Sequence, residues 1–127
     1  MNPTFNLPSA NERFVVEEQE PTAANNYTRY RLYNDGFIEQ GGTCAANYSG
    51  AAVTFPVTMN DGNYQFQLSV GQGQLTGTVG TVVDNRTTTG MTVYTNYSTG
   101  QPSYICWEIK GMAATAPAYN KVQCIRF

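Results

Sequence analysis

The sequence predicts an all-β protein, an antiparallel β-sandwich of about six to eight strands. Short runs alternate apolar and polar residues, which is the period of a strand with one buried face. No segment keeps the apolar period of a helix over three turns, so no long helix is expected. Gly, Pro, Asn and Asp separate the runs at the spacing typical of sandwiches and barrels.

The expected strands follow the chain in order, each between turn-forming residues. In the first half they are "RFVVEEQ" (13–19), "YTRYRLY" (27–33), "FIEQGGTCA" (37–45), "AAVTFP" (51–56) and "YQFQLSVG" (64–71). In the second half they are "TVGTVVD" (78–84), "GMTVYTN" (90–96) and "YICWEIKGMA" (104–113), with a further candidate in "KVQCIRF" (121–127). The turns between them include "NDG" (34–36), "MNDGN" (59–63), "DNRTTTG" (84–90) and "NYSTGQPS" (96–103).

The first hairpin can be assigned a register from its side chains. A two-residue turn would place Leu32 opposite Glu39 and mix apolar with charged residues on both faces. A three-residue loop with Gly36 in the left-handed position matches every pair. The expected pairs are Tyr33 with Phe37, Leu32 with Ile38, and Arg31 with Glu39 as a cross-strand ion pair.

Two consecutive glycines, Gly41 and Gly42, interrupt the strand that follows this hairpin. Glycine inside a strand indicates either a bulge or the close approach of another backbone. Both explanations remain open from the sequence. Trp107 alternates with Ile105 and Ile109 and is therefore expected in the core.

The length and composition of the chain limit the classes of protein to which it can belong. The chain has 127 residues, enough for one domain and one core. Only 13% of residues are charged, about half the usual share, and the net charge is -2. No basic cluster suggests nucleic acid, no apolar run is long enough to insert in a membrane, and the start "MNPTFNLPSA" does not resemble a signal peptide.

The residues that usually hold metals or close disulfides are scarce. The chain has no His, and its three cysteines, Cys44, Cys106 and Cys124, form no C-x-x-C pair. Free, buried thiols are the favoured interpretation, with one disulfide and a leftover thiol as the alternative. We expect no metal site and no cofactor. Four N-x-S/T tripeptides, at Asn26, Asn47, Asn85 and Asn96, are expected by chance in a chain rich in these residues.

Catalytic constellations are also missing from the sequence. Without His the commonest general base is absent, and no nucleophile elbow, phosphate-binding glycine loop or zinc-binding helix motif occurs. The carboxylates lie mainly at turns or in the first strand, where solvated or turn-capping roles are the default. We therefore expect no catalytic residues and no enzymatic activity.

The better functional candidates are aromatic and amide side chains in and beside the loops. Tyrosine faces stack on sugars, while amides, carboxylates and guanidinium groups bond to sugar hydroxyls. The predicted ligand-binding residues are Asp84, Arg86, Tyr94, Asn96, Tyr97, Gln101 and Tyr104.

Several of these segments, in this order, resemble the C-terminal receptor-binding knobs of bacteriophage and prophage tail fibres. The most specific is a D-G-x-x-E-Q-G-G run formed by Asp35, Gly36, Glu39, Gln40, Gly41 and Gly42. This run ends the segment "FVVEEQEPTAANNYTRYRLYNDGFIEQGG" (14–42). The looser segments are "VTFPVTMNDGNYQFQL" (53–68), "NRTTTGMTVY" (85–94) and "CWEIKGMA" (106–113), so the resemblance covers roughly residues 14–113. Phe37 stands where the family often has Trp, which keeps the aromatic pair.

The resemblance implies a small H-type-lectin-like sandwich that forms a homotrimer at a fibre tip and binds a glycan or other receptor on a bacterial surface. It implies synthesis in the bacterial cytoplasm and location in the virion. Residues 1–12 would be a linker from the fibre shaft or an added leader, and 13–127 one knob domain, with 114–127 as an extension that can add a strand. It also offers Gly41 and Gly42 as a place where protomers meet. The alternatives are a fibre assembly module without its own receptor site, and a free-standing lectin or secreted glycoprotein domain.

Overall fold

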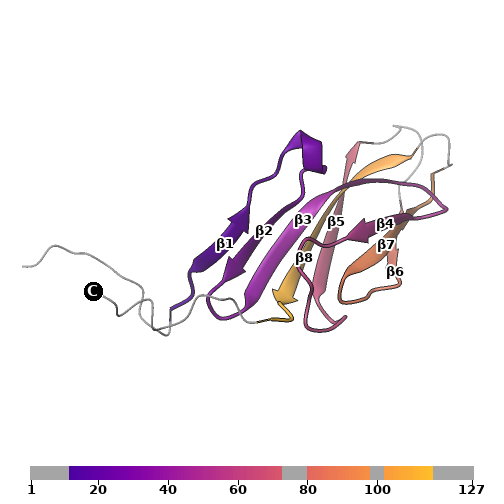
Figure 1. Cartoon of the computed structure of the whole chain (residues 1–127). Coiled ribbons are helices and arrows are strands. Elements are labelled where there is room, and N and C mark those ends of the chain that lie inside the picture. Colours follow the sequence, from indigo (N-terminus) through magenta and orange to yellow (C-terminus); the bar gives the residue numbers. More distant parts are fainter. Residues whose placement is uncertain (1–11, 73–79, 98–101, 116–127) are drawn as a thin grey trace, which may run out of the picture.

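The computed structural model describes residues 12–72, 80–97 and 102–115 of the chain. Within these ranges, strands form two antiparallel sheets, which confirms the all-β sandwich (Figure 1). Sheet A has five strands in the order β1-β2-β3-β8-β5, and sheet B has three in the order β4-β7-β6. Strands adjacent in sequence are therefore neighbours in sheet A for β1 to β3, while β8 inserts between β3 and β5.

The strand bounds agree with the sequence prediction within a few residues. Sheet A is built from β1 (Val15–Gln19), β2 (Arg29–Tyr33), β3 (Phe37–Ala46), β8 (Ser103–Met112) and β5 (Gln65–Gln72). Sheet B is built from β4 (Ala51–Thr54), β7 (Gly90–Thr95) and β6 (Thr81–Asp84). The candidate strand at 121–127 lies outside the described residues.

The largest difference concerns the segment that precedes β2. A 3-10 turn, Ala23–Asn25, occupies part of it, and Asn26 and Tyr27 then both adopt left-handed backbone angles, with φ of 58° and 56°. Two consecutive left-handed residues cannot continue a strand. This is why β2 begins at Arg29 and not at the predicted residue 27.

The first hairpin has the predicted register. Leu32 pairs with Ile38 and Arg31 with Glu39, Gly36 has φ of 92°, and its amide donates to the carbonyl of Tyr33 at 2.9 Å. The rings of Tyr33 and Phe37 lie with centroids 5.7 Å apart. The three-residue loop and its aromatic pair are confirmed.

The expected ion pair across this hairpin is wrong, although the two residues are opposite each other. Arg31 Nε lies 3.4 Å from Glu18 on β1, and Glu39 lies 3.6 Å from Lys110 on β8. The register aligns these four residues in one row across the outer face of sheet A. Each inner charge therefore has two oppositely charged neighbours, and each forms its ion pair with the outer one.

Within the chain the two glycines of β3 are explained by side chains, and the expected bulge is wrong. The contact between protomers at these glycines stays a prediction. β3 pairs regularly with β8 through Gly41 and Gly42, with no bulge. A Cβ at Gly41 would lie 2.6 Å from Cζ of Arg29 on the outer face. A Cβ at Gly42 would lie 3.0 Å from the indole of Trp107 on the inner face. Each glycine makes room for one large side chain, on opposite faces of the sheet.

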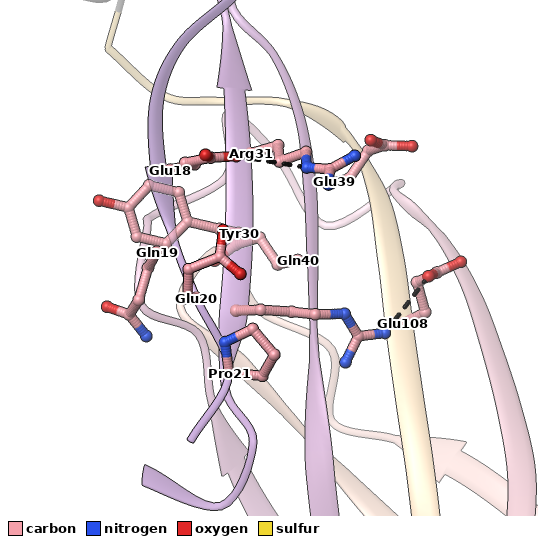
Figure 2. Close-up of a pocket in the computed structure, with 10 residues that line it drawn as sticks. Glu18, Gln19, Glu20, Pro21, Tyr30, Arg31, Glu39, Gln40 and Glu108 are labelled. Carbon is pink, nitrogen blue, oxygen red and sulfur yellow. Dashed lines mark hydrogen bonds and ion pairs between the residues drawn. The ribbon is translucent and has the colours of Figure 1, made fainter.

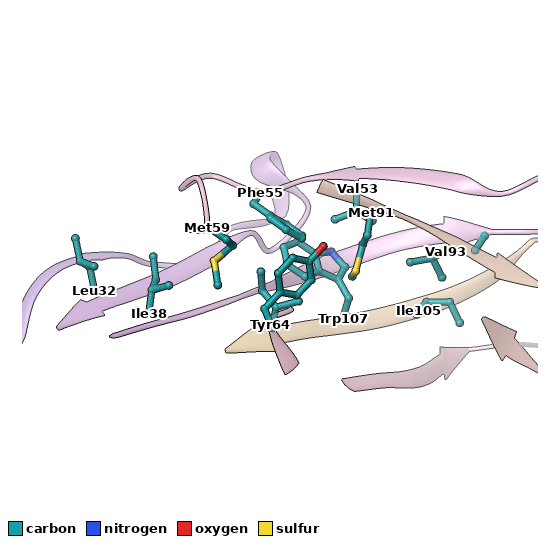
Figure 3. Packing of buried hydrophobic residues seen from close by; sticks show 12 residues of the cluster. Leu32, Ile38, Val53, Phe55, Met59, Tyr64, Met91, Val93, Ile105 and Trp107 are labelled. Atoms are coloured by element: carbon teal, nitrogen blue, oxygen red, sulfur yellow. The ribbon is translucent and has the colours of Figure 1, made fainter. Parts of the chain in front are cut away.

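The core lies between the two sheets (Figure 3). Ile38, Ile105 and Ile109 of sheet A are fully buried, and Trp107, 3% exposed, packs against Phe55 with ring centroids 5.7 Å apart. The core position predicted for Trp107 is confirmed. Burial of such side chains is the main source of stability in a domain of this size.

A buried glutamine fixes the connection after β4 to sheet A. Gln40 is 1% exposed, its Nε2 donates to the carbonyl of Val57 at 2.7 Å, and its Oε1 accepts from the amide of Val57 at 2.9 Å. One side-chain amide thus satisfies both backbone groups of Val57. The connection carries Met59, 1% exposed, into the core.

Candidate functional site

The predicted ligand residues within the described ranges lie at two ends of the sandwich. Asp84 and Arg86 lie at the end that holds the 34–36 hairpin loop. Four more lie at the opposite end, where β3 and β7 end and β8 begins. We call this end of the sandwich the tyrosine end. Its predicted residues are Tyr94, Asn96, Tyr97 and Tyr104. Gln101 lies outside the described residues.

Arg86 is engaged in contacts within the fold. Its Nη1 donates to the carbonyl of Tyr64 at 3.0 Å, and its guanidinium lies 5.5 Å from the Tyr64 ring centroid and 5.3 Å from that of Phe66. Asp84 accepts a hydrogen bond from the amide of Asn85, a residue with φ of 53°. Asp84 therefore stabilises the turn after β6, and Arg86 attaches this turn to Tyr64 and Phe66.

At the tyrosine end, Tyr94 and Tyr97 border the turn at 47–50, and Asn96 contacts the chain before β6. Gly50 lies against the ring of Tyr94, so closely that a Cβ there would be 2.7 Å from a ring carbon. Asn96 Oδ1 accepts from the amide of Gly80 at 3.1 Å, and the carbonyl of Tyr97 accepts from the amide of Tyr48 at 2.9 Å. The residues therefore hold loops together.

Tyr104 lies on the other side of this end, beside a notch in sheet A. The notch has a volume of about 370 Å³. It lies where β3 extends beyond Arg29, the first residue of β2. Tyr104 is 40% exposed and its hydroxyl lies 3.1 Å from Thr43 Oγ1. The polar and aromatic residues that line the notch are Asn26, Thr28, Thr43, Thr54, Tyr104 and Trp107.

Asn26, the first residue of the left-handed pair Asn26–Tyr27, lines this notch. The carbonyl of Asn26 accepts from both the amide and the hydroxyl of Thr43, at 3.0 and 2.9 Å. Left-handed backbone is costly for a tyrosine and often occurs at functional sites. The sequence prediction missed Asn26 and Thr43; asparagine tolerates left-handed angles, but nothing in the sequence marks Tyr27 for one.

The predicted residues do not converge on one site. Tyr94 alternates with buried Met91, Val93 and Thr95, so it faces outward from sheet B. Tyr104 alternates with buried residues of β8 and faces outward from sheet A. Two outer faces of a sandwich point in opposite directions, so a single small ligand cannot contact both rings.

A second hollow, also missed by the sequence prediction, lies on the outer face of sheet A (Figure 2). It has a volume of about 280 Å³ and is bordered by the chain that leaves β1 at Glu20 and Pro21. The guanidinium of Arg29 lies against Gly41 of β3 and reaches Glu108 Oε2 at 3.5 Å. Four carboxylates and two guanidinium groups line this groove: Glu18, Glu20, Glu39, Glu108, Arg29 and Arg31.

Comparison with known proteins was made by sequence and by fold. No family model and no curated protein matches the chain. By fold, a C-terminal fragment of the P. aeruginosa R2 pyocin fibre matches with a TM-score of 0.59 and 20% identity, over 76% of this chain and 26% of that one. An N-terminally truncated R2-type pyocin tail fibre matches with a TM-score of 0.58 and 20% identity, over 77% and 39%.

The chain has a tail-fibre-like fold. It spans well under half the length of either fibre chain, and at this identity the similarity is one of fold. The sequence resemblance to tail fibres is thus supported at the level of the domain architecture.

Some ionisable groups of the domain have shifted pKa values because of contacts within the fold. Burial, and secondarily the charge of Cys106, raise the pKa of the Cys44 thiol to about 11, so it stays protonated at neutral pH. A hydrogen bond to Glu39, burial and the charge of Glu39 raise the pKa of Tyr33. Both described cysteines are free thiols.

Metal ligands and membrane-spanning helices were also sought in the described residues. No group of three or more His, Cys, Asp or Glu side chains in that part of the chain is arranged to hold a metal ion. None of its helices is long and apolar enough to cross a bilayer.

Proposed function

We propose that this chain is a non-catalytic receptor-binding domain at the tip of a tail fibre, part of a phage or phage-like particle, and that it binds a glycan on a bacterial surface. It acts as a homotrimer, made in the bacterial cytoplasm and assembled into the virion. The observation that carries the proposal is the fold similarity to two pyocin fibre fragments. The glycan ligand and the homotrimer are further parts of the proposal, which the experiments below test.

The notch at the tyrosine end is the proposed glycan site. An exposed tyrosine ring there can stack on the apolar face of a sugar, and the hydroxyls and amide around it can bond to sugar hydroxyls. None of the residues lining the notch carries a formal charge at neutral pH, which suits a neutral sugar. Asn26, Thr43 and Tyr104 are linked by hydrogen bonds, so the site is formed before the ligand arrives.

Adsorption of fluorescent domain to a panel of bacterial strains, together with a bacterial glycan array, tests this proposal. Tyr104→Ala should reduce binding at least tenfold. Met112→Ala is the matched control, because it removes an equally exposed side chain, 40%, at the other end of β8. Absence of binding by the wild-type domain to every strain and glycan would refute the receptor-binding function.

A third variant, Arg29→Ala, tests whether the glycan binds in the groove on sheet A or in the notch. Loss of binding in Arg29→Ala with full binding in Tyr104→Ala would assign the glycan to the groove on sheet A and remove it from the notch. The receptor-binding function would stand in that case.

A fibre assembly module is the second candidate function, and an exposed apolar surface on β5 favours it. Phe66 and Val70 are 44% and 43% exposed. An assembly module would form the trimer but show no adsorption to any strain. The same adsorption experiment therefore distinguishes the two functions.

A further inference from the structure

The apolar surface on β5 is a continuation of the core that the described residues leave partly exposed. Phe66, Leu68 and Val70 pair with Ile109, Trp107 and Ile105 of β8, whose side chains are buried. Paired residues lie on the same face of a sheet, so the three β5 side chains face the inner side. Phe66 and Val70 nevertheless remain 44% and 43% exposed, and we call Phe66, Leu68 and Val70 the β5 stripe.

The two edges of sheet A differ in how they are protected against pairing with other chains. β1, at one edge, carries Glu17 and Glu18 and has an irregular register between Val15 and Glu17. Charges and bulges of this kind prevent edge-to-edge association. β5, at the other edge, has the sequence QFQLSVGQ and contains no charged residue in eight positions.

The absence of charge on β5 indicates what kind of partner covers it. Around a symmetry axis each side chain approaches its own copy, so a charged residue there would meet a like charge. An uncharged apolar stripe meets its copies without repulsion and removes apolar surface from water. Arg86 contacts the ring of Phe66 at one end of the stripe, and the rest of the stripe is uncharged.

We infer that the β5 stripe is the surface through which copies of this chain contact one another. The inference rests on the homotrimer of the proposed function and names the contact that holds it together. Phe66, Leu68 and Val70 of each copy lie toward the symmetry axis, and β1 with its carboxylates lies away from it.

A matched pair of valine variants tests this contact. Val70→Asp places a carboxylate on the stripe, and Val15→Asp places one on the opposite edge strand, at a side chain of similar exposure, 43% against 40%. By analytical ultracentrifugation, Val15→Asp should associate like the wild type. Val70→Asp should associate roughly a hundredfold more weakly, because burying an unpaired carboxylate is costly. Thermal melts of both variants report whether they are folded.

Photo-crosslinking covers the case in which Val70→Asp does not fold. The photoreactive residue p-benzoylphenylalanine replaces Val70 in a mixture of ¹⁴N- and ¹⁵N-labelled protein. Crosslinked peptides that join the two isotopes support the inference. Crosslinks confined to one chain, for example to residues 116–127, would overturn it, because the chain's own segment then covers the stripe.

The outcomes also separate this inference from the proposed function. A Val70→Asp protein that is still trimeric overturns the inference and leaves the trimer intact. A wild-type protein that is monomeric at micromolar concentration overturns both the trimer and the stripe contact. Receptor binding is measured independently, by adsorption of the wild type and of Tyr104→Ala.

Discussion

At the scale of single residues, several positions in the run from Asp35 to Gly42 have distinct structural roles. Asp35 Oδ2 bonds to Arg13 at 2.7 Å, and Gly36 supplies the left-handed angle of the turn. Gln40 holds Val57 in the core. The role of Gly36 could be predicted, because it depends on residues next to it in sequence. The roles of Gly41 and Gly42 could not, because they depend on two distant side chains.

Substitution to alanine should lower the free energy of unfolding by different amounts at Gly41 and Gly42. Gly41→Ala displaces the end of a flexible, half-exposed Arg29 side chain, so the free energy of unfolding should fall by less than about 1 kcal/mol. Gly42→Ala pushes against the indole of Trp107 in the packed core and should cost about 1 to 3 kcal/mol. Urea denaturation measures both. Equal losses would contradict the assignment of the glycines to different faces.

Cys44 and Cys106 should differ in their reactivity toward alkylation in the folded protein. With a pKa of about 11, roughly one Cys44 thiol in a thousand is deprotonated at pH 8, and the side chain is partly buried. Cys106 is exposed on the outer face of β8. Iodoacetamide at pH 8 should therefore label Cys106 first, as peptide mass spectrometry reports. Labelling of Cys44 should accelerate as the pH rises toward 11.

Unfolded protein is the control for the cysteine experiment. In urea the two thiols should react at similar rates, since burial no longer separates them. Preferential labelling of Cys44 in the folded state would show that its side chain is not shielded by the sheet.

At the scale of elements, strand identity was largely predictable and strand ends were not. The period-two runs identify every strand of both sheets. The start of β2 was missed because two left-handed residues precede it. The ion-pair partners of Arg31 and Glu39 were missed because they come from β1 and β8, whose alignment beside the hairpin is a property of the whole sheet.

The link between β3 and the connection after β4 should depend on one side chain. Gln40→Ala leaves the partly buried amide and carbonyl of Val57 without partners, which should reduce the free energy of unfolding by roughly 1 to 3 kcal/mol. Gln67→Ala, an exposed glutamine on β5, is the control and should change it by less than about 0.5 kcal/mol. A change in Gln40→Ala as small as that of the control would show that water replaces both hydrogen bonds.

At the scale of the whole molecule, the proposed binding and association surfaces are separate. The notch lies at the β2 side of sheet A, where β3 extends past Arg29, and the β5 stripe lies at the opposite edge strand. β3 and β8 lie between the two edge strands and supply five of the twelve buried residues of the hydrophobic core. The predicted ligand residues were scattered because the sequence shows which residues are in loops but not which loops share an end.

This separation predicts that multivalency and single-site affinity can be changed independently. A trimer that presents three copies of a weak site to a bacterial surface gains roughly 10² to 10⁴ in apparent affinity over one site. Val70→Asp should therefore lose that factor in adsorption to cells while keeping the wild-type affinity for a soluble monovalent glycan fragment, measured by calorimetry. Tyr104→Ala should show the reverse: it stays trimeric and loses the soluble glycan. If Val70→Asp also lost the soluble glycan while remaining folded, the stripe would be part of the binding site, and the two surfaces would have to be treated as one formed between protomers.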